Sequence, residues 1–456
     1  MELFSMILAA GEGKRMKSKI AKPLQPAAGK ALVEWVLDAA EGAGIEKNVV
    51  VIGHKAEDMK EYLKERVQYA YQYEQLGTGH AVMQGMAAIS EEEGTVVVLS
   101  GDSPLMTAKT LRTCIKVHEE EGCAATVITT VVDEPFGYGR IVRKEGKICR
   151  IVEQKDTNEE EEQICEINSG MYCFDLKKLH SALKRLTNEN AQGEYYITDV
   201  IEILLGDGEK VGTYQTALEE TLGVNDKVQL AAVDAILNRR LVKQAMLEGV
   251  TVVDPATTRI GAGVKIGCDT VIQPNTILEG KTVIGEDCEI GPNTRLTNCV
   301  IGNNTEVAFS VGIESKIGDR THVGPFAYLR PNTVVGDEIK VGDFVELKNA
   351  TIGNGTKIAH LTYVGDAQVG ERVNFGCGTV VVNYDGVHKH KTIIEDDCFI
   401  GCNSNLVSPV TIKKGAYTAA GSTITDMVPE GALAIARSRQ VNKESWTSKK
   451  RKQKED

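Results

Sequence analysis

The sequence lacks the features of a membrane-spanning or secreted protein. No part of its 456 residues approaches a run of about 18 uncharged apolar residues, so no membrane-spanning helix is expected. The N-terminus, Met-Glu-Leu-Phe-Ser, has no basic segment before an apolar core, which argues against a secretory signal. An excess of positive charge is also missing: the net charge of −12 disfavours broad binding to nucleic acid, because phosphate backbones need a basic surface. We therefore expect a cytoplasmic protein without a nucleic-acid partner.

Paired cysteine spacing is absent as well. The eleven cysteines are an odd number and are scattered through strand-like segments, so we expect reduced, buried thiols. Cys398 and Cys402 have no other ligands nearby in the sequence, which disfavours a zinc site.

The charged segment from Lys443 contains the run 449–452 of Lys-Lys-Arg-Lys. We expect a solvated terminus, with a contact to ligand phosphates as the alternative.

An aliphatic side chain recurs every six residues through most of the second half of the chain. The runs are Ile260, Ile266, Ile272, Leu278, Ile284, Ile290, Leu296; Val311, Ile317, Val323, Leu329, Val335, Val341, Leu347; Ile352, Ile358, Val364; Val369, Phe375, Val381; and Ile394, Ile400, Leu406, Ile412. A fixed short period is typical of a solenoid, in which each repeat is stable only when stacked on its neighbours. Three short strands joined by turns make one triangular coil, and the periodic side chains should point inward as columns. Chance alternation in an ordinary β-rich domain is the alternative.

The first half has a different pattern. Strands are expected at Phe4–Ala9, Asn48–Ile52 and Val96–Ser100, and helices at Leu32–Ala43 and Lys109–Glu121. This alternation predicts a mostly parallel, doubly wound α/β sheet. In such sheets ligands bind beyond the carboxyl ends of the strands.

Small and charged residues gather at those strand ends. Leu8 and Ala9 end the first strand, Ala10 and Gly11 continue into a loop, and backbone N–H groups in such a loop can bind an anion. Arg15 and Lys22 add positive charge for a polyphosphate, although the glycine spacing fits neither the P-loop nor the dinucleotide fingerprint. Asp102 ends a buried strand as an exposed carboxylate suited to Mg²⁺. The alternatives are a turn aspartate whose hydrogen bonds are satisfied, and a purely structural Gly-Thr-Gly turn at 77–79.

The segment from Leu8 to Met16 with Lys22-Pro23 resembles the signature loop of sugar-nucleotide pyrophosphorylases, with Lys14 where that family has Thr. The segment 75–81 resembles the family's base-binding turn. The residues that the resemblance assigns to the nucleotide are Leu8, Ala9, Ala10, Gly11, Arg15, Lys22, Gln72, Gly77 and Thr78. It assigns Gly139, Glu153 and Asn168 to the sugar, Asp102 and Asn225 to Mg²⁺, and the segment 193–199 to the shape of the sugar pocket. The implied reaction is in-line attack of a sugar 1-phosphate on a nucleoside triphosphate, catalysed by positioning and charge neutralisation.

Polar residues accumulate where the six-residue period is interrupted. Arg330 and Lys348 are 18 residues apart, and Lys348 and Tyr363 are 15 apart. Since one coil has roughly 18 residues, these side chains should align on one face. The step from Val381 to Ile394 is 13 residues, which indicates an inserted loop at Asn383.

Taken together, both halves resemble the bifunctional N-acetylglucosamine-1-phosphate uridylyltransferase and glucosamine-1-phosphate acetyltransferase family over essentially the whole chain. The resemblance implies His360 as general base, Arg330 and Lys348 on the sugar phosphate, and Tyr363 and Asn374 on the sugar. The residues that it assigns to acetyl-CoA are Asn383, Tyr384, Cys402, Ala420 and Arg437, with Cys402 where many relatives have Ser. It also implies a homotrimer with the coenzyme A cleft between neighbouring solenoids. By itself, His360 could equally be a polar residue of the solenoid exterior.

The patterns and the resemblance together predict an N-terminal α/β, Rossmann-like nucleotidyltransferase domain followed by a parallel β-helix of hexapeptide repeats. The resemblance alone implies that this β-helix is left-handed. We expect a uridylyltransferase domain at 1–225, a helical linker at 226–250, an acetyltransferase domain at 251–440 and a charged tail at 441–456. The predicted function is acetylation of glucosamine 1-phosphate by acetyl-CoA, then Mg²⁺-dependent transfer from UTP to N-acetylglucosamine 1-phosphate, which supplies a cell-wall precursor. The alternatives are a transferase for another sugar, such as glucose 1-phosphate, and a solenoid that serves only as a scaffold.

Overall fold

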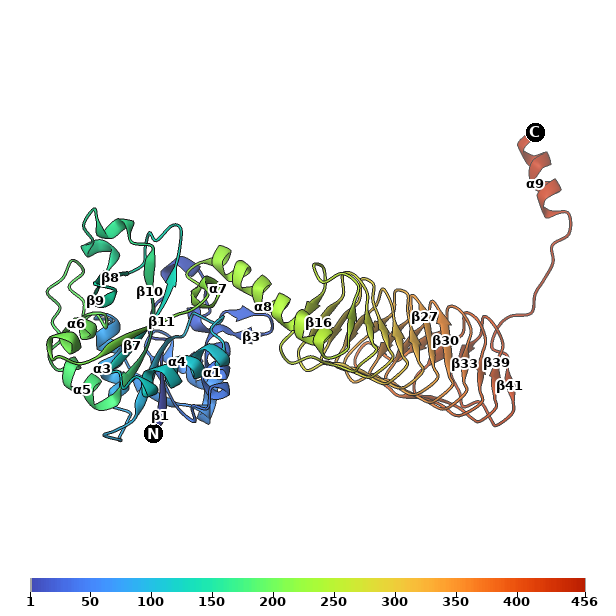
Figure 1. The fold of residues 1–456 in the computed structure, drawn as a ribbon. Coiled ribbons are helices and arrows are strands. Elements are labelled where there is room, and N and C mark those ends of the chain that lie inside the picture. The colour runs from blue at the N-terminus through green and yellow to red at the C-terminus, as the bar shows by residue number, and fades with distance from the viewer. Residues whose placement is uncertain (1, 456) are drawn as a thin grey trace. The chain divides into compact units, whose positions relative to one another are not determined.

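The computed structural model describes residues 2–455, which form two compact units, Met1–Asn238 and Arg239–Asp456 (Figure 1). Helix α8 spans Lys227–Leu247, and the division between the two units falls within this helix. The segment 226–250, expected to be helical, is thus largely helix α8. In the charged tail, α9 spans Trp446–Glu455, and residue 456 lies outside the described residues.

The first unit is built on one mixed sheet with the strand order β11-β7-β10-β6-β1-β4-β5. The strands are β1 (Leu3–Leu8), β4 (Lys47–Ile52), β5 (Gln68–Tyr71), β6 (Thr95–Ser100), β7 (Ala125–Val131), β10 (Glu166–Asp175) and β11 (Val211–Gln215). β1 pairs in parallel with β4 and β6, whereas β10 runs antiparallel to β6 and β7. The hairpin of β8 (Arg140–Lys144) and β9 (Lys147–Val152) joins the sheet through β10.

Helices cover this sheet, as Figure 1 shows. They are α1 (Leu32–Gly42), α2 (Ala56–Leu63), α3 (Thr78–Met86), α4 (Ala108–Glu120), α5 (Leu176–Leu183), α6 (Asp199–Gly206) and α7 (Leu218–Thr221). The strand residues Val49–Ile52 and Val96–Leu99 are buried in succession, because side chains on both faces of the sheet pack under helices. The three strands and two helices expected from the sequence are confirmed to within two residues at each end.

The second unit is a three-sided solenoid from β12 (Thr251–Val252) to β41 (Leu433–Ala434). Its three parallel sheets have 11, 10 and 9 strands, and along each sheet a strand pairs with the third strand after it, except that β39 (Tyr417–Thr418) pairs with β41. The inward side chains form one continuous apolar core along the axis, which confirms the six-residue period as the inward position. Buried hydroxyls at the corners bond to carbonyls of the next coil; Thr321, for example, donates to Gly336 over 2.9 Å.

Val311 is the exception, and the prediction for it was wrong. In β22 (Val311–Ile313) the valine side chain is 37% exposed, and Gly312 takes the inward position, opposite Leu296 and Leu329. A Cβ on Gly312 would lie 2.9 Å from Leu296 Cδ2 and 3.2 Å from Cys299 Sγ. These two neighbours already fill the interior, so the coil needs no side chain there.

All eleven cysteines are free, as expected, but burial was predicted for too many of them. Cys165, Cys268 and Cys402 are exposed, and Cys149 and Cys377 are only partly buried. Cys268, Cys377 and Cys402 lie in the solenoid, where a strand-like segment also has outward positions, whereas Cys149 and Cys165 belong to the first unit. Within residues 2–455, none of the helices has both the length and the apolar character needed to cross a membrane.

Candidate active sites

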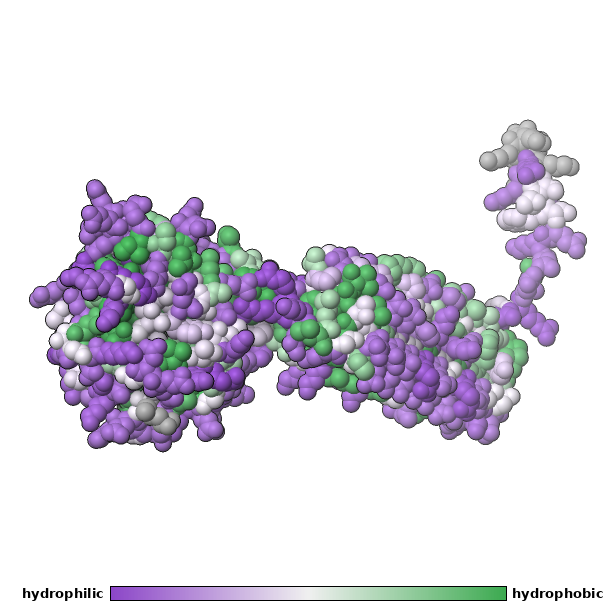
Figure 2. All heavy atoms as spheres, viewed as in Figure 1, coloured by the Kyte–Doolittle hydropathy of each residue, from purple (hydrophilic) through white to green (hydrophobic). Residues whose placement is uncertain are grey.

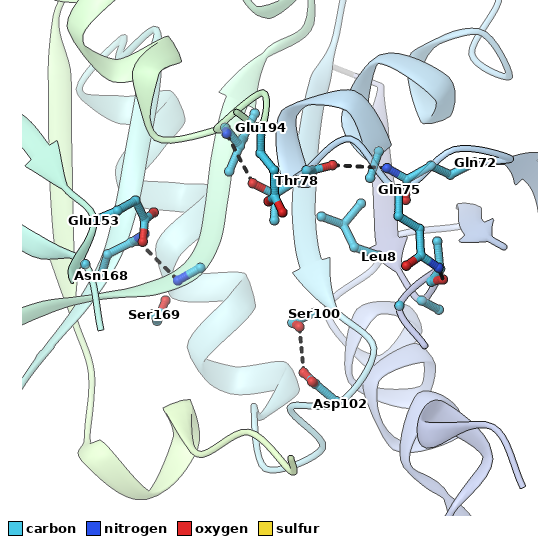
Figure 3. Close-up of a pocket in the computed structure, with 18 of the residues that line it drawn as sticks. Leu8, Gln72, Gln75, Thr78, Ser100, Asp102, Glu153, Asn168, Ser169 and Glu194 are labelled. Carbon is cyan, nitrogen blue, oxygen red and sulfur yellow. Dashed lines mark hydrogen bonds between the residues drawn. The ribbon is translucent and has the colours of Figure 1, made fainter. Parts of the chain in front are cut away.

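A pocket of about 530 Å³ opens at the carboxyl ends of β1 and β6 (Figure 3). Leu8, Ala9, Ala10 and Gly11 line it, and the Gln75 side chain holds the loop by donating to the Ala10 carbonyl over 3.0 Å. These loop residues therefore lie where the sequence places a nucleotide. The pocket follows the general rule for open α/β sheets, in which ligands bind beyond the strand ends.

Positive charge enters this site from Lys22 and Arg15. Lys22 lines the main pocket and also an adjoining cavity of about 320 Å³, which Arg15 and Asn225 share. The Arg15 guanidinium donates to the Asn225 side-chain oxygen over 2.9 Å. The two cations thus lie beside the glycine loop, although Arg15 belongs to the smaller cavity.

Asp102 and Asn225 direct their oxygens at one position. The Lys22 ammonium forms an ion pair with Asp102 and lies 3.4 Å from the Asn225 oxygen. Val224 N–H donates to the Asp102 carbonyl over 2.9 Å, which brings the loop of Asn225 to the end of β6. The expectation that the Asp102 carboxylate is exposed was wrong. Its side chain is only 16% exposed, because it is paired with Lys22. Mg²⁺ prefers oxygen ligands such as these two side chains. The Lys22 ammonium lies where a bound metal ion would be expected.

One end of the pocket carries the residues expected to contact the base. Gln72 is buried, and its side-chain nitrogen donates to the Gly77 carbonyl over 3.1 Å (Figure 3). Thr78 begins α3 and accepts a hydrogen bond from Ile197 N–H over 3.2 Å. The positive φ of Gly77 (105°) gives the sharp entry into α3, and a side chain there would strike Tyr195.

The opposite side of the pocket holds Glu153 and Asn168 (Figure 3). Burial raises the pKa of Glu153, whose carboxylate accepts a hydrogen bond from Thr198 over 3.2 Å. Asn168 donates to the Tyr172 hydroxyl over 2.7 Å. A Cβ on Gly139 would lie 3.5 Å from Asn168 Cβ and 3.6 Å from Glu153 Oε2, so glycine keeps this corner open. The three residues expected to bind the sugar thus converge.

A second cavity, of about 430 Å³, lies on the solenoid. Arg330 and Lys348 line it together with Asp366 and Lys389. Arg330 directly follows β25 (Tyr328–Leu329), and Lys348 ends β28 (Glu346–Lys348), the next strand of the same sheet. Their alignment on one sheet confirms the inference from the 18-residue spacing. The neighbouring ammonium of Lys348 lowers the pKa of Lys389, which shows that cations are crowded here.

Tyr363 stands beside this cavity on β31 (Tyr363–Gly365). Its hydroxyl is 3.5 Å from the Asn383 side-chain nitrogen, which also donates to Asp366. Gly365 opposes Lys348 in the sheet, and a side chain there would overlap the Tyr363 hydroxyl. Glycine therefore lets the tyrosine ring lie along the strand toward the cations.

His360 lies on the adjacent sheet, at the end of β30 (Lys357–His360). Its Nδ1 atom is 2.7 Å from Asp343 Oδ1, and Asp343 ends β27 (Lys340–Asp343), the paired strand one coil earlier. The hydrogen bond from His360 lowers the pKa of Asp343, so this carboxylate is ionised at neutral pH. Asn374 begins β33 (Asn374–Phe375), in the sheet of His360 and not in that of Tyr363.

The residues expected at acetyl-CoA lie toward the end of the solenoid. Tyr384 is exposed on the inserted loop and donates to the Gly386 carbonyl over 2.6 Å. Cys402, Ala420 and Arg437 are all exposed on successive coils. Gly421 N–H donates to the Cys402 carbonyl over 2.8 Å, and a Cβ on Gly421 would lie 3.7 Å from Arg437 Cδ. Asn383 and Tyr384 instead adjoin the cation cavity, because Asn383 donates to Asp366 and Tyr384 pairs with Lys389.

Sequence reasoning missed three charged residues of the solenoid site: Asp343, Asp366 and Lys389. Asp343 precedes His360, and Asp366 precedes Asn383, by 17 residues in each case, which is close to one coil. That offset was available as a signal. Lys389 carried none, because the loop that places it follows no repeat.

Residues 4–219 match the nucleotidyl transferase family, and residues 263–298 and 391–426 match the bacterial transferase hexapeptide family of six repeats. The chain is 56% identical over 450 residues to the "Bifunctional protein GlmU" of Acetivibrio thermocellus, covering 98% of each chain. Proteins of the same name from Geobacillus thermodenitrificans (52% over 450 residues) and Thermoanaerobacter pseudethanolicus (54% over 449 residues) also match over 98% of both chains.

The chain belongs to the bifunctional GlmU family. It is accordingly a uridylyltransferase and an acetyltransferase that makes UDP-N-acetylglucosamine, as the sequence predicts. The three-sided solenoid is the left-handed parallel β-helix of hexapeptide repeats, and the first unit is the nucleotidyltransferase fold.

Proposed function

We propose that acetylation precedes uridylyl transfer and that each reaction has its own site. Glucosamine 1-phosphate receives an acetyl group from acetyl-CoA at the solenoid cavity, and the product then reacts with UTP in the α/β pocket. The convergence of Lys22, Asp102 and Asn225 beside the glycine loop is the observation that supports the second site. We also propose the division into residues 1–225, 226–250, 251–440 and 441–456, and a cytoplasmic location.

In the α/β pocket, the protein positions two phosphorylated substrates. The 1-phosphate oxygen of the sugar attacks the α-phosphorus of UTP, and pyrophosphate leaves with the bonding electron pair. Lys22 and Arg15 neutralise charge on the phosphates, Gln72 and Thr78 lie at the base, and Glu153 and Asn168 orient the sugar. No general base is needed, because the attacking phosphate is already an anion.

Asp102 and Asn225 would hold Mg²⁺ in this pocket. Their oxygens already surround the Lys22 ammonium, so the donor set fits a cation. A bound Mg²⁺ would stabilise negative charge on the reacting phosphates. Lys22 then moves its charge from Asp102 to the phosphates.

At the solenoid, His360 takes a proton from the amine of glucosamine 1-phosphate as the nitrogen attacks the thioester carbonyl. Asp343 holds Nδ1, which leaves Nε2 to accept the proton. Coenzyme A leaves as its thiolate and takes up that proton. Arg330, Lys348 and Lys389 surround the sugar phosphate, and Tyr363 with Asn374 would contact the sugar.

We propose a homotrimer in which neighbouring solenoids complete the acetyl-CoA sites. Phe309, Phe326, Phe344 and Leu361 form a column on one solenoid corner and are between 41% and 58% exposed. The Phe326 ring lies 5.8 Å from that of Phe309 and 5.4 Å from that of Phe344. All four have positive φ, where bulky residues are rare, and hydrophobic residues reach the solenoid surface in Figure 2. An exposed apolar column on a repeating scaffold fits contact with a second copy.

The function is tested by two assays on one preparation. Thiol release from acetyl-CoA should require glucosamine 1-phosphate, and pyrophosphate release from UTP should require N-acetylglucosamine 1-phosphate. Glucose 1-phosphate in the second assay tests the alternative sugar. Absence of coenzyme A release would leave the solenoid as a scaffold and contradict the proposal.

A further inference from the structure

A polar cluster behind the base end of the nucleotide pocket has no role in the chemistry above. His80 and Gln84 lie four residues apart on α3 and therefore share one face of that helix. The His80 ring lies between the side-chain amides of Gln72 and Gln84, with each ring nitrogen 3.2 Å from one amide. His80 thus contacts Gln72 from the side away from the pocket.

The orientation of the Gln72 amide follows from its first partner. One of its terminal atoms lies 3.1 Å from the Gly77 carbonyl oxygen. A carbonyl oxygen can only accept a hydrogen bond, so the terminal atom that faces it is the NH₂ group. The Gln72 oxygen is then the other terminal atom.

The protonation of His80 follows from the same NH₂ group. This nitrogen lies 3.2 Å from His80 Nδ1 and can only donate, so Nδ1 must be the acceptor. The ring is therefore neutral and carries its proton on Nε2. The Gln84 side-chain nitrogen lies 3.2 Å from Nε2. An NH₂ group cannot accept a hydrogen bond, so the Gln84 amide must be turned by 180° to place its oxygen opposite Nε2–H.

This chain of hydrogen bonds leaves Gln72 with one free group. Both NH₂ hydrogens are used, one on Gly77 and one on His80, so only the carbonyl oxygen can serve a ligand in the pocket that Gln72 lines. Uracil carries a hydrogen on N3, whereas N3 of cytosine is an acceptor. An acceptor at this point attracts the first base and repels the second.

We propose that His80 is a positioning residue that fixes the Gln72 amide and thereby selects UTP over CTP. The inference rests on the proposed contact between Gln72 and the base. His80 touches neither substrate; it acts by withholding the NH₂ group from the pocket. A rotated amide would direct its oxygen at the Gly77 carbonyl, which can only accept. It would also require the His80 proton to move from Nε2 to Nδ1 and the Gln84 amide to turn with it, so His80 couples the orientation of Gln72 to that of Gln84.

The test compares kcat/KM for UTP and CTP in the full-length protein, with N-acetylglucosamine 1-phosphate as the second substrate. His80→Leu removes the acceptor, and the UTP-to-CTP ratio should fall about tenfold, the equivalent of roughly one hydrogen bond. His80→Asn can place a side-chain oxygen near the position of Nδ1 and should restore most of the ratio. A merely structural role would lower both rates together and leave the ratio unchanged, which would overturn the proposal.

Two controls keep the outcome interpretable. The melting temperature of the first unit reports whether each variant is folded, and acetyl transfer, which takes place in the other unit, reports the amount of protein in each sample. If His80→Leu does not fold, Gln84→Leu removes the partner of Nε2 and should lower the ratio in the same direction; an unchanged ratio there counts against the inference. Failure of the wild-type protein to release pyrophosphate from UTP would instead contradict the proposed function itself.

Discussion

His360 and Asp343 face each other from paired strands of successive coils, with 2.7 Å between Nδ1 and Oδ1. The carboxylate stays ionised at neutral pH, because the hydrogen bond from His360 lowers its pKa. The pair therefore presents Nε2 of an oriented imidazole to the solvent side of the solenoid, which is the arrangement that a general base requires.

His360→Ala should lower the kcat of acetyl transfer by about 10²-fold or more, the usual contribution of a general base. Uridylyl transfer should be unaffected, since it takes place in the other unit. Asp343→Asn should reduce kcat less than His360→Ala and leave the KM for acetyl-CoA unchanged. Coenzyme A release and pyrophosphate release, measured on the same samples, check both. Loss of both activities in His360→Ala would mean that the two sites are not independent.

Asp102→Ala should have the reverse effect. Removal of the carboxylate takes away one oxygen of the proposed Mg²⁺ site and the partner of Lys22. Pyrophosphate release should fall by about 10²-fold or more at low Mg²⁺ and recover in part as Mg²⁺ is raised. Asp133→Ala, the same substitution at an exposed residue of the first unit, is the matched control. An unchanged Mg²⁺ titration in Asp102→Ala would exclude the assignment.

Lys389→Ala should raise the KM for glucosamine 1-phosphate several-fold, because it removes one of the three cations in the cavity. Lys348 lowers the pKa of Lys389, so in the free enzyme Lys389 loses its proton at a lower pH than an ordinary lysine. The wild-type KM should therefore rise with pH at alkaline values, and the Lys389→Ala variant should lack that rise. Lys391→Ala is the control, since Lys391 is engaged by Gln368 over 3.0 Å. Equal pH profiles for Lys389→Ala and wild type would refute the role.

Glu153→Gln should raise the stability of the folded protein at pH 7 and lower its uridylyl transfer activity. Burial raises the pKa of Glu153 in the folded state. Neutral Glu153 therefore contributes fully to the free energy of unfolding below the ordinary pKa of a glutamate. That contribution is lost as the pH rises through the raised pKa of the folded state. At pH 7 the amide should therefore raise the melting temperature of the first unit, where about 1 kcal/mol corresponds to roughly 2–4 °C. At acidic pH the difference should vanish.

The controls for Glu153→Gln separate burial from charge. The exposed Glu159→Gln removes the same charge and should leave the melting temperature unchanged. Uridylyl transfer should fall in Glu153→Gln through a higher KM for N-acetylglucosamine 1-phosphate. A melting temperature below that of the wild type at pH 7 would show that the ionised carboxylate is stabilising after all.

Phe326→Glu should dissociate the proposed trimer. The substitution places a charge in the middle of the column of Phe309, Phe326, Phe344 and Leu361. Molar mass from light scattering should fall toward that of the 49.4 kDa chain, and acetyl transfer should fall with it. Val300→Glu, at an exposed residue of another sheet, should change neither. A trimer that survives Phe326→Glu would place the interface elsewhere.

The solenoid could be predicted because its period repeats. Each inward residue reports on the same physical requirement, so Leu329, Val335 and Val341 support one another, and the 18-residue offset aligns Arg330 with Lys348. Val311 was misassigned because the inward place there is filled from other coils, by Leu296 and Cys299. A single sequence position carries no record of what neighbouring coils already supply.

The site could be predicted only in part. The loop of Leu8 to Gly11 and the end of β6 at Asp102 follow from local patterns, and the structure brings them together. The ion pair of Asp102 with Lys22 and the contacts of Asn383 with Asp366 join residues far apart in the chain, and no local pattern encodes them. Which two side chains form an ion pair or a hydrogen bond depends on how the strands and loops pack together. That packing cannot be read from residues far apart in the sequence.

The parallel pairing of β25, β28 and β31 has a consequence for how such chains can lengthen. Neighbouring strands are about 4.8 Å apart. A coil duplicated between Arg330 and Tyr363 would therefore increase the distance between these two residues by about that amount. A coil added near β12 would leave every spacing in the acetyl-transfer site unchanged. Insertions and deletions among descendants of this chain should therefore be concentrated in the early coils and be absent from the three that carry the substrate.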